Sequence, residues 1–465
     1  MKNLFKIRTL FFTLICVFAW LPLLTGDYAQ GQYLHLQKKN PTIEEMVSKI
    51  SLDEVVRMHD IFVSFVNMNT FSDTVSNTRG VGACRRWIYS EFEKFSKASG
   101  GRLQVYYDNF EVNIPDRENL QELWGDSEKL RIANVVALLP GKTDNIRFII
   151  NGHYDTRASS GYDITSPAPG ANDDGSGTVI TMELARVLSQ YEFDHTLMFV
   201  ANIGEEQGLY GATHMAQNAV DEGWEIGGVI ADDIIGNIIG GNGIINDSAA
   251  RVFSQDPVDS KSRHWARYCK FIGEPYAPEL KLNLVFRLDR YGRGGDQRAF
   301  VQRGFPGIRF TELNEYFAHQ HGVNVDLVEF MSREYVTKVA RIQAAIMASA
   351  GLAPRPVTMM NPSRDRSDYS TRLRWTHQTV ETDVAGYRIF IRKTDSGYWQ
   401  EIIDVGMPEK QTTTTGRGED RREVEMYQVN LMHRSIDDYI FGIAAYDNQG
   451  NIGIVSTYEQ PERNQ

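Results

Sequence analysis

Cysteine is scarce in this sequence. Its 465 residues include three cysteines, and only Cys84 and Cys269 lie outside an apolar N-terminal stretch. Two cysteines are too few for a disulfide framework or for a zinc site built from thiolates, and the sequence does not tell whether they pair with each other. A metal ion in this chain must therefore be held by histidine and carboxylate side chains.

An excess of positive charge is also absent. The formal net charge is −11, whereas a protein that binds nucleic acid presents a basic surface to the phosphates. Hydrophobic residues make up 42% and charged residues 23% of the chain, which is typical of a globular protein with a sizeable core. The composition therefore excludes nucleic acid as the main partner and predicts a folded chain.

Long hydrophobic runs are missing except at the N-terminus. Lys2, Lys6 and Arg8 precede an apolar stretch over residues 10–24, which is shorter than the roughly 20 residues of a membrane-spanning helix. The pattern predicts a signal peptide over approximately residues 1–26, a secreted or periplasmic location, and no membrane span in the mature chain. An uncleaved anchor is the alternative.

Residues 27–352 show the pattern of an α/β domain. Apolar residues recur at spacings of three and four between residues 43 and 98, and Thr42 and Ser51 are expected to cap the first helices. Nearly continuous apolar strands then alternate with amphipathic helices up to residue 351. This alternation predicts a mainly parallel, mixed sheet that is sandwiched by helices.

The C-terminal part has a different sequence pattern. A proline-bearing linker is expected over residues 353–367, and residues 368–465 show alternating strands without a helix pattern. The stretches "LRW", "GYRIFIR" and "YIFGIAAYDNQG" resemble strands of a fibronectin type III module, which implies a small all-β sandwich. The module could bind a partner protein, a glycan or the cell envelope, or it could cover the first domain, and its sequence favours none of these roles.

Ligand-type side chains recur where the predicted strands of the α/β domain end. They follow "FIING", "FVANIG" and "VIA", and a further pair lies in "GANDDGSG" just before a predicted helix. Each motif alone is ambiguous, because acids are also common in turns and at helix starts. The residues are His153 and Asp155, Asp173 and Asp174, Glu205 and Glu206, and Asp232 and Asp233.

Together, these side chains predict a metal centre. The carboxyl ends of parallel strands meet at one edge of a sheet, so the motifs are expected to converge in space. Several carboxylates buried together are tolerated only around a compensating cation. Zinc accepts imidazole and carboxylate ligands, and two zinc ions about 3.5–4 Å apart with a bridging water form a site for amide hydrolysis.

The motif series "GHYDT", "GANDDGSG", "GEEQGLYGA", "DDIIG" and "HQH" resembles that of the two-zinc aminopeptidase family, which also contains glutaminyl cyclases and non-catalytic receptors. The resemblance covers roughly residues 70–350. It implies two zinc ions and a peptide substrate. It also implies Glu205 as the general base that takes a proton from the metal-bridging water. The implied metal ligands are His153, Asp173 as the bridge, Glu206, Asp233 and His321.

Some implied roles leave alternatives open. His319 competes with His321 as the last ligand, and Asp232 competes with Asp233. The resemblance gives Asp155 the role of orienting His153, and it gives Asp174 a supporting role. In "GRGGDQRAF", Asp296 is expected to support the site with Gln297 in place of the family's histidine. Tyr291 is the candidate for stabilising the oxyanion.

The motifs suggest three candidate functions. An exported zinc exopeptidase, most simply an aminopeptidase, fits all the motifs, and dipeptidase or carboxypeptidase specificity is open. A glutaminyl cyclase would use one zinc, but its central motif resembles "GATDSAVP" where this chain has "GANDDGSG". A non-catalytic binding protein would have lost ligand positions, and none is lost here.

Overall fold

The structure is a computed structural model that describes residues 39–142, 146–255, 259–287, 289, 294–365, 369–378, 383–415 and 422–458. The expected signal peptide (1–26) and Tyr291 lie outside these residues. Within the described part of the chain, no helix is both long enough and apolar enough to cross a membrane.

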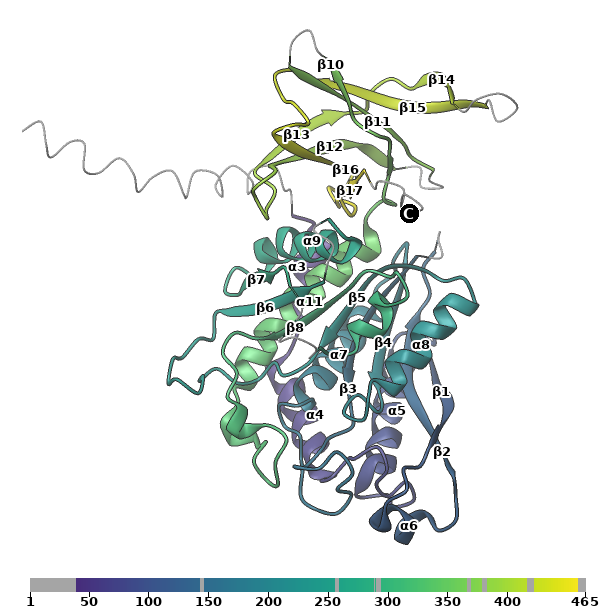
Figure 1. The fold of residues 1–465 in the computed structure, drawn as a ribbon, viewed down its shortest axis with the longest axis vertical. Coiled ribbons are helices and arrows are strands. Elements are labelled where there is room, and N and C mark those ends of the chain that lie inside the picture. Colours follow the sequence, from purple (N-terminus) through teal and green to yellow (C-terminus); the bar gives the residue numbers. More distant parts are fainter. Residues whose placement is uncertain are drawn as a thin grey trace, which may run out of the picture.

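An eight-stranded mixed sheet forms the centre of the first domain, in the order β1-β2-β4-β3-β5-β8-β6-β7 (Figure 1). The middle strands β4, β3, β5 and β8 run parallel to one another, and β6 with β7 forms a further parallel pair. The pairs β1–β2, β2–β4 and β8–β6 are antiparallel, so the predicted mainly parallel mixed sheet is confirmed. The strands are β1 (Gln104–Asn113), β2 (Lys129–Leu139), β3 (Ile146–His153), β4 (Thr196–Asn202), β5 (Glu225–Asp232), β6 (Ala249–Ser254), β7 (Lys281–Val285) and β8 (Gly307–Glu312).

Helices cover both faces of this sheet, because its central strands are apolar on both sides. On β3, Ile150 belongs to the core beneath α7, whereas its neighbour Ile149 belongs to a second core beneath α8 and α10. This alternation is the two-residue period of an extended strand. The helices are α3 (Pro41–Ser48), α4 (Leu52–Ser64), α5 (Gly80–Ala98), α6 (Glu118–Trp124), α7 (Gly175–Leu188), α8 (Tyr210–Asp221), α9 (Lys261–Tyr276), α10 (Gln297–Val301) and α11 (Arg333–Leu352), with the 3-10 turns η1 (Phe317–His319) and η2 (Val328–Phe330).

Two helix caps near the N-terminus test the sequence prediction. Ser51 caps α4 by accepting a hydrogen bond from the Glu54 amide, as expected. Thr42 is not the cap of α3; Asn40 is, and its side chain accepts a hydrogen bond from the Thr42 amide. Pro41 explains the difference, because proline is favoured at the first helical position, and the cap is then the residue before it, Asn40.

The C-terminal part is a sandwich of two antiparallel sheets, which confirms the predicted all-β fold. Its inner core includes Phe441, Ile443 and Ala445, which alternate along β16 and therefore share one face. The likeness to a fibronectin type III module remains a prediction. Two of its strands, β9 and β10, lie inside the segment expected to be a linker. The strands are β9 (Thr358–Met359), β10 (Ser363–Asp365), β11 (Ser370–Thr376), β12 (Val384–Lys393), β13 (Glu401–Gly406), β14 (Gln411–Thr415), β15 (Arg422–Leu431), β16 (Tyr439–Asp447) and β17 (Ser456–Thr457).

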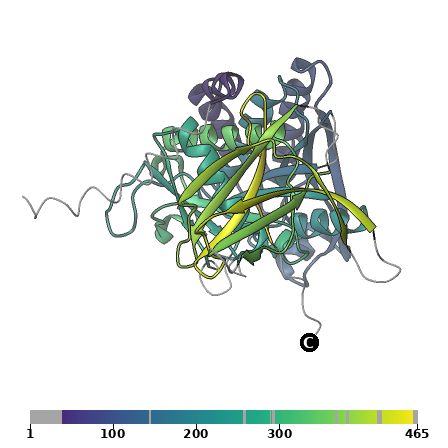
Figure 2. The same cartoon turned by 90° about the horizontal axis from the view of Figure 1, so that it is seen from above.

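The sandwich packs against the α/β domain over α9 (Figures 1 and 2). Phe390 of β12 meets Phe271 of α9 edge to face, with ring centroids 5.4 Å apart, and belongs to the same apolar core as the large sheet. A polar clamp lies beside this contact: Asp259 accepts hydrogen bonds from Arg392 of the sandwich and from Arg267 of α9. The central strands β12 and β16 of the β13-β12-β16-β17 sheet therefore bury side chains on both faces.

Cys84 and Cys269 do not pair. Cys84 lies in α5 and Cys269 in α9, and both are buried free thiols. Burial raises the pKa of each thiol well above its usual value, because the thiolate would lose its hydration. They act as small apolar core residues.

The buried contact between sandwich and α/β domain can be tested with Phe390→Ala. Removing the ring leaves a cavity between β12 and α9, and the expected loss is about 3 kcal/mol of the free energy of unfolding. Urea denaturation of the full chain measures it, with Met432→Ala on the exposed surface as the control. A midpoint shift no larger than that of the control would show that the interface contributes nothing.

Candidate metal centre

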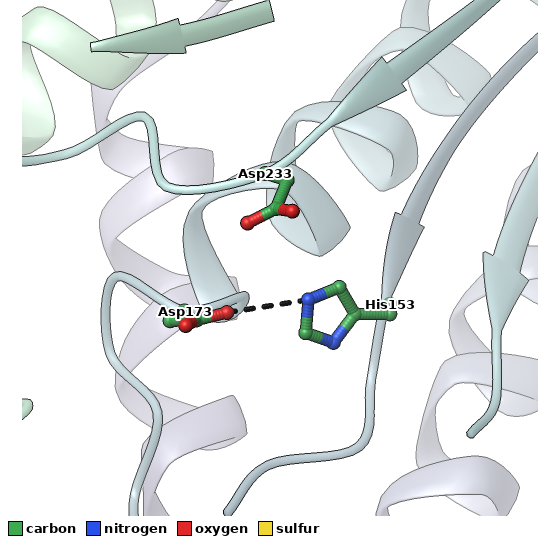
Figure 3. Close-up of side chains that lie close together, drawn as sticks. All are labelled: His153, Asp173 and Asp233. Carbon is green, nitrogen blue, oxygen red and sulfur yellow. Dashed lines mark ion pairs between the residues drawn. The ribbon is translucent and has the colours of Figure 1, made fainter. Parts of the chain in front are cut away.

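The predicted ligand motifs converge at the carboxyl edge of the large sheet. His153 is the last residue of β3, and Asp233 follows the last residue of β5. Asp173 lies in the loop that leads into α7, and Figure 3 shows these three side chains turned toward one another. Strand order explains the meeting, because β3 and β5 are parallel neighbours and end side by side.

Two groups of potential ligands share one residue. His153, Asp173 and Asp233 form the first group, in which one ligand atom from each lies within 4.8 Å of the others. Asp173, Glu206 and His321 form the second group by the same measure. Asp173 thus belongs to both, with Oδ1 lying 3.2 Å from Nε2 of His153 and Oδ2 lying 2.8 Å from Nε2 of His321.

The side chains present fit zinc. Nε2 of His153 and Oε1 of Glu206 are buried, and their 3.2 Å contacts with Asp173 and His321 do not have hydrogen-bond geometry, which is costly unless a further ligand satisfies them. Oε1 of Glu206 lies 3.2 Å from Nε2 of His321. In each group, the potential ligand atoms therefore lie close enough together to surround one metal ion. Two imidazoles and three carboxylates are donors that zinc prefers in proteins.

The protonation states of the carboxylates and imidazoles in the centre depend on one another. Burial disfavours charge on Asp173, but His321 and His153 outweigh burial and hold the pKa of this carboxyl well below its usual value. Burial likewise opposes protonation of His321, yet its contacts with Asp173 and Glu206 raise its pKa to about 11. Without metal, protons on the imidazoles therefore provide the positive charge that the carboxylates require.

Glu205 lies beside this pair of groups and in neither of them. Burial raises the pKa of its carboxyl well above the usual value, and the neighbouring charges of Asp233, Glu206 and Asp296 raise it further, against the effect of His153. A carboxylate with a raised pKa is a better proton acceptor at neutral pH than an ordinary glutamate.

Asp155 holds the loop that carries the two glutamates. Its carboxylate accepts hydrogen bonds from the amides of Gly204, Glu205 and Glu206, at 2.8 to 3.2 Å. The expected contact with His153 is made differently: Nδ1 lies 3.0 Å from the main-chain oxygen of Asp155 but 3.7 Å from its carboxylate. The carboxylate turns away because three backbone donors of the β4–α8 loop converge on it.

Two further aspartates fix the position of Asp173. Asp174 caps α7, and its carboxylate accepts hydrogen bonds from the amides of Gly177 and His153. Asp326 accepts hydrogen bonds from the amides of Asn172 and Asp173, both at 2.8 Å. Asp326 was not anticipated from the sequence, although its position in the loop after His321 is a usable signal.

The structure separates the two pairs of competing ligands. Asp232 points into the core, where its carboxylate accepts a hydrogen bond from Gln343 at 2.5 Å, while Asp233 faces His153. His319 is stacked on Phe330 with ring centroids 3.8 Å apart, while His321 lies in the second group.

Supporting residues surround the first group. Asp296 accepts a hydrogen bond from Asn202 at 2.7 Å, and burial raises its pKa to about 7. Arg309 of β8 was not anticipated: its fully buried guanidinium pairs with Asp289 and lies 3.2 Å from Oδ2 of Asp233. The expected oxyanion group, Tyr291, lies outside the described residues.

The sequence is similar to those of known zinc metalloproteases. A model of peptidase family M28 matches residues 134–347. A probable zinc metalloprotease of Pyrenophora tritici-repentis is 34% identical over 407 residues, which cover 81% of this chain and 82% of the relative. One from Phaeosphaeria nodorum is 30% identical over 463 residues, covering 90% and 88%.

Solved structures share the fold. LapA aminopeptidase of Legionella pneumophila matches 67% of this chain and 74% of its own, with a TM-score of 0.51 and 22% identity. An aminopeptidase from Aneurinibacillus sp. strain AM-1 matches 67% of this chain and 96% of its own, with a TM-score of 0.50 and 15% identity.

The role of Asp326 predicts the effect of Asp326→Asn. The amide presents an N–H to one of the two backbone donors, so the loop bearing Asp173 shifts. Zinc affinity is expected to fall by about 10- to 100-fold without loss of the fold. Competition with a chromophoric chelator measures this affinity, with Asp60→Asn on the exposed face of α4 as control. Equal affinities for the two variants would contradict the role.

The raised pKa of His321 predicts proton release. An imidazole with a pKa of about 11 is still protonated at pH 8, and zinc binds only the unprotonated form. Zinc binding at pH 8 should therefore release protons, and affinity should weaken as pH falls. Calorimetry in two buffers of different ionisation enthalpy measures the release, which His321→Ala should lower by about one proton and His319→Ala should not. Identical heats in both buffers would refute it.

Proposed function

Because this chain belongs to peptidase family M28 and is a zinc metallopeptidase, we propose that it is a two-zinc aminopeptidase that hydrolyses the N-terminal bond of peptides. The observation that carries the proposal is the pair of ligand groups that share Asp173, with Glu205 immediately beside them. His153 and Asp233 would hold one ion, Glu206 and His321 the other, and Asp173 both.

Zinc, when bound, lowers the pKa of coordinated water and polarises the carbonyl of the scissile bond. Glu205 accepts the proton of the attacking water and passes it to the leaving amine. Its raised pKa suits both steps, because it both accepts a proton near neutral pH and releases it again. Asp155 keeps Glu205 and Glu206 on one loop, so the base and the ligand hold a fixed relation.

The fold is one that aminopeptidases use, as the two bacterial structures illustrate.

The same proposal places the enzyme outside the cytoplasm, in a secreted or periplasmic location. Its support is the basic and apolar pattern of residues 1–26. We further propose that the C-terminal sandwich acts chiefly by covering α9, since one of its sheets is buried against the α/β domain.

Glu205→Gln tests the proposed base. The glutamine keeps the shape of the side chain but accepts no proton, so kcat on a leucine amide should fall by about 100- to 10,000-fold. Zinc content, measured by atomic emission, should stay at two ions per chain. Glu329→Gln, an acid outside both groups, is the control and should keep the activity.

Two outcomes would contradict the proposal. Full activity of Glu205→Gln would assign the base to another residue. A wild-type protein that cyclises N-terminal glutamine with one zinc, and hydrolyses no aminoacyl amide, would be a cyclase.

A further inference from the structure

The open side of the metal centre lies next to the second ligand group. Within the first group, His153 and Asp233 are buried, and Glu206 of the second has a side chain only 4% exposed. The side chain of His321 is 37% exposed, and that of Arg157 is 27% exposed. Of these residues, therefore, only His321 and Arg157 are accessible to an approaching substrate.

Arg157 differs from the other arginine at this centre. Arg309 pairs with Asp233 and Asp289, but it is fully buried behind the first group and out of reach of a substrate. Arg157 lies on the open side, in the loop that follows β3, with Nη1 lying 3.6 Å from Oε2 of Glu206. The position of Arg157 therefore predicts that it contacts the substrate, whereas the buried Arg309 cannot.

The guanidinium of Arg157 is weakly engaged. Its Nε donates to the main-chain oxygen of Ala158 at 3.5 Å, and its Nη2 donates to that of Ser159 at 3.4 Å. Both distances are at the long limit for hydrogen bonds, and a guanidinium has five N–H donors in a planar fork. A cation bound by Glu206 would weaken the attraction between the Glu206 carboxylate and Arg157. The guanidinium of Arg157 therefore keeps N–H donors and positive charge that can bind a ligand.

We infer that Arg157 is a specificity-determining residue that binds a carboxylate of the substrate. A guanidinium fork matches a carboxylate in shape and charge, and such paired hydrogen bonds are stronger than those between neutral groups. The inference rests on the proposed aminopeptidase function and narrows its substrate class to peptides that carry a carboxylate close to the scissile bond.

Two substrate groups supply this chemistry. One is an acidic side chain on the N-terminal residue, and the other is the terminal carboxylate of a dipeptide. Each has a neutral partner of nearly the same shape. Glutamyl and glutaminyl anilides differ only in the side-chain carboxylate, and leucyl-glycine and leucyl-glycinamide differ only in the terminal one.

The experiment measures kcat/KM of the zinc-loaded full chain for both pairs. The wild type should prefer the carboxylate member of one pair, and that pair identifies the source. In Arg157→Ala the ratio of the two kcat/KM values should fall by about 10- to 100-fold, the loss expected for a hydrogen bond to a charged group. Arg157→Lys keeps the charge without the fork and should recover part of the ratio.

A surface arginine provides the matched control. Arg341→Ala on α11 removes a partner of Glu279 and should leave both ratios unchanged. The inference is overturned if the wild type shows no preference in either pair, or if Arg157→Ala lowers both members by one factor together with the zinc content, since Arg157 would then only position Glu206. Failure of the proposed function looks different, because then none of the four substrates is hydrolysed.

Discussion

The centre depends on one carboxylate that faces two positions at once. Asp173 presents one oxygen to His153 and the other to His321, so its side chain has no freedom left to adjust. The backbone around it must therefore be fixed by other groups. Asp326 holds the amide of Asp173 itself, and Asp174 joins the start of α7 to the end of β3. Pairs of buried acids are tolerated here because backbone donors and imidazoles compensate each of them.

The two sides of Asp173 differ in exposure. Groups on the buried side hold the centre in place, and groups on the exposed side face the substrate. Behind His153, the fully buried Arg309 anchors Asp233 and closes the centre. In front, Glu206 lies between the partly exposed His321 and Arg157. The end of β3 and the residue after β5 thus supply His153 and Asp233, while loops supply the other ligands, of which only His321 is partly exposed. Binding groups on loops can vary between relatives without disturbing the sheet.

The sequence predicted the parts of this protein that follow from regular patterns. Strand ends carrying His153 and Asp233 were identifiable, because apolar runs mark the strands and parallel strands end together. The strands β6 and β7 were not predicted, since each is short and irregular in pattern. Asp326, Arg309 and the true partners of the Asp155 carboxylate were missed, because backbone hydrogen bonds between distant loops leave no periodic signal.

Anomalous diffraction at the zinc edge tests the account's central claim most directly. Crystals grown with zinc should show two ions on either side of Asp173, one bound by His153 and Asp233 and the other by Glu206 and His321. A single ion, or two ions that do not share Asp173, would contradict the account, because the bridging carboxylate would then have no function in the centre.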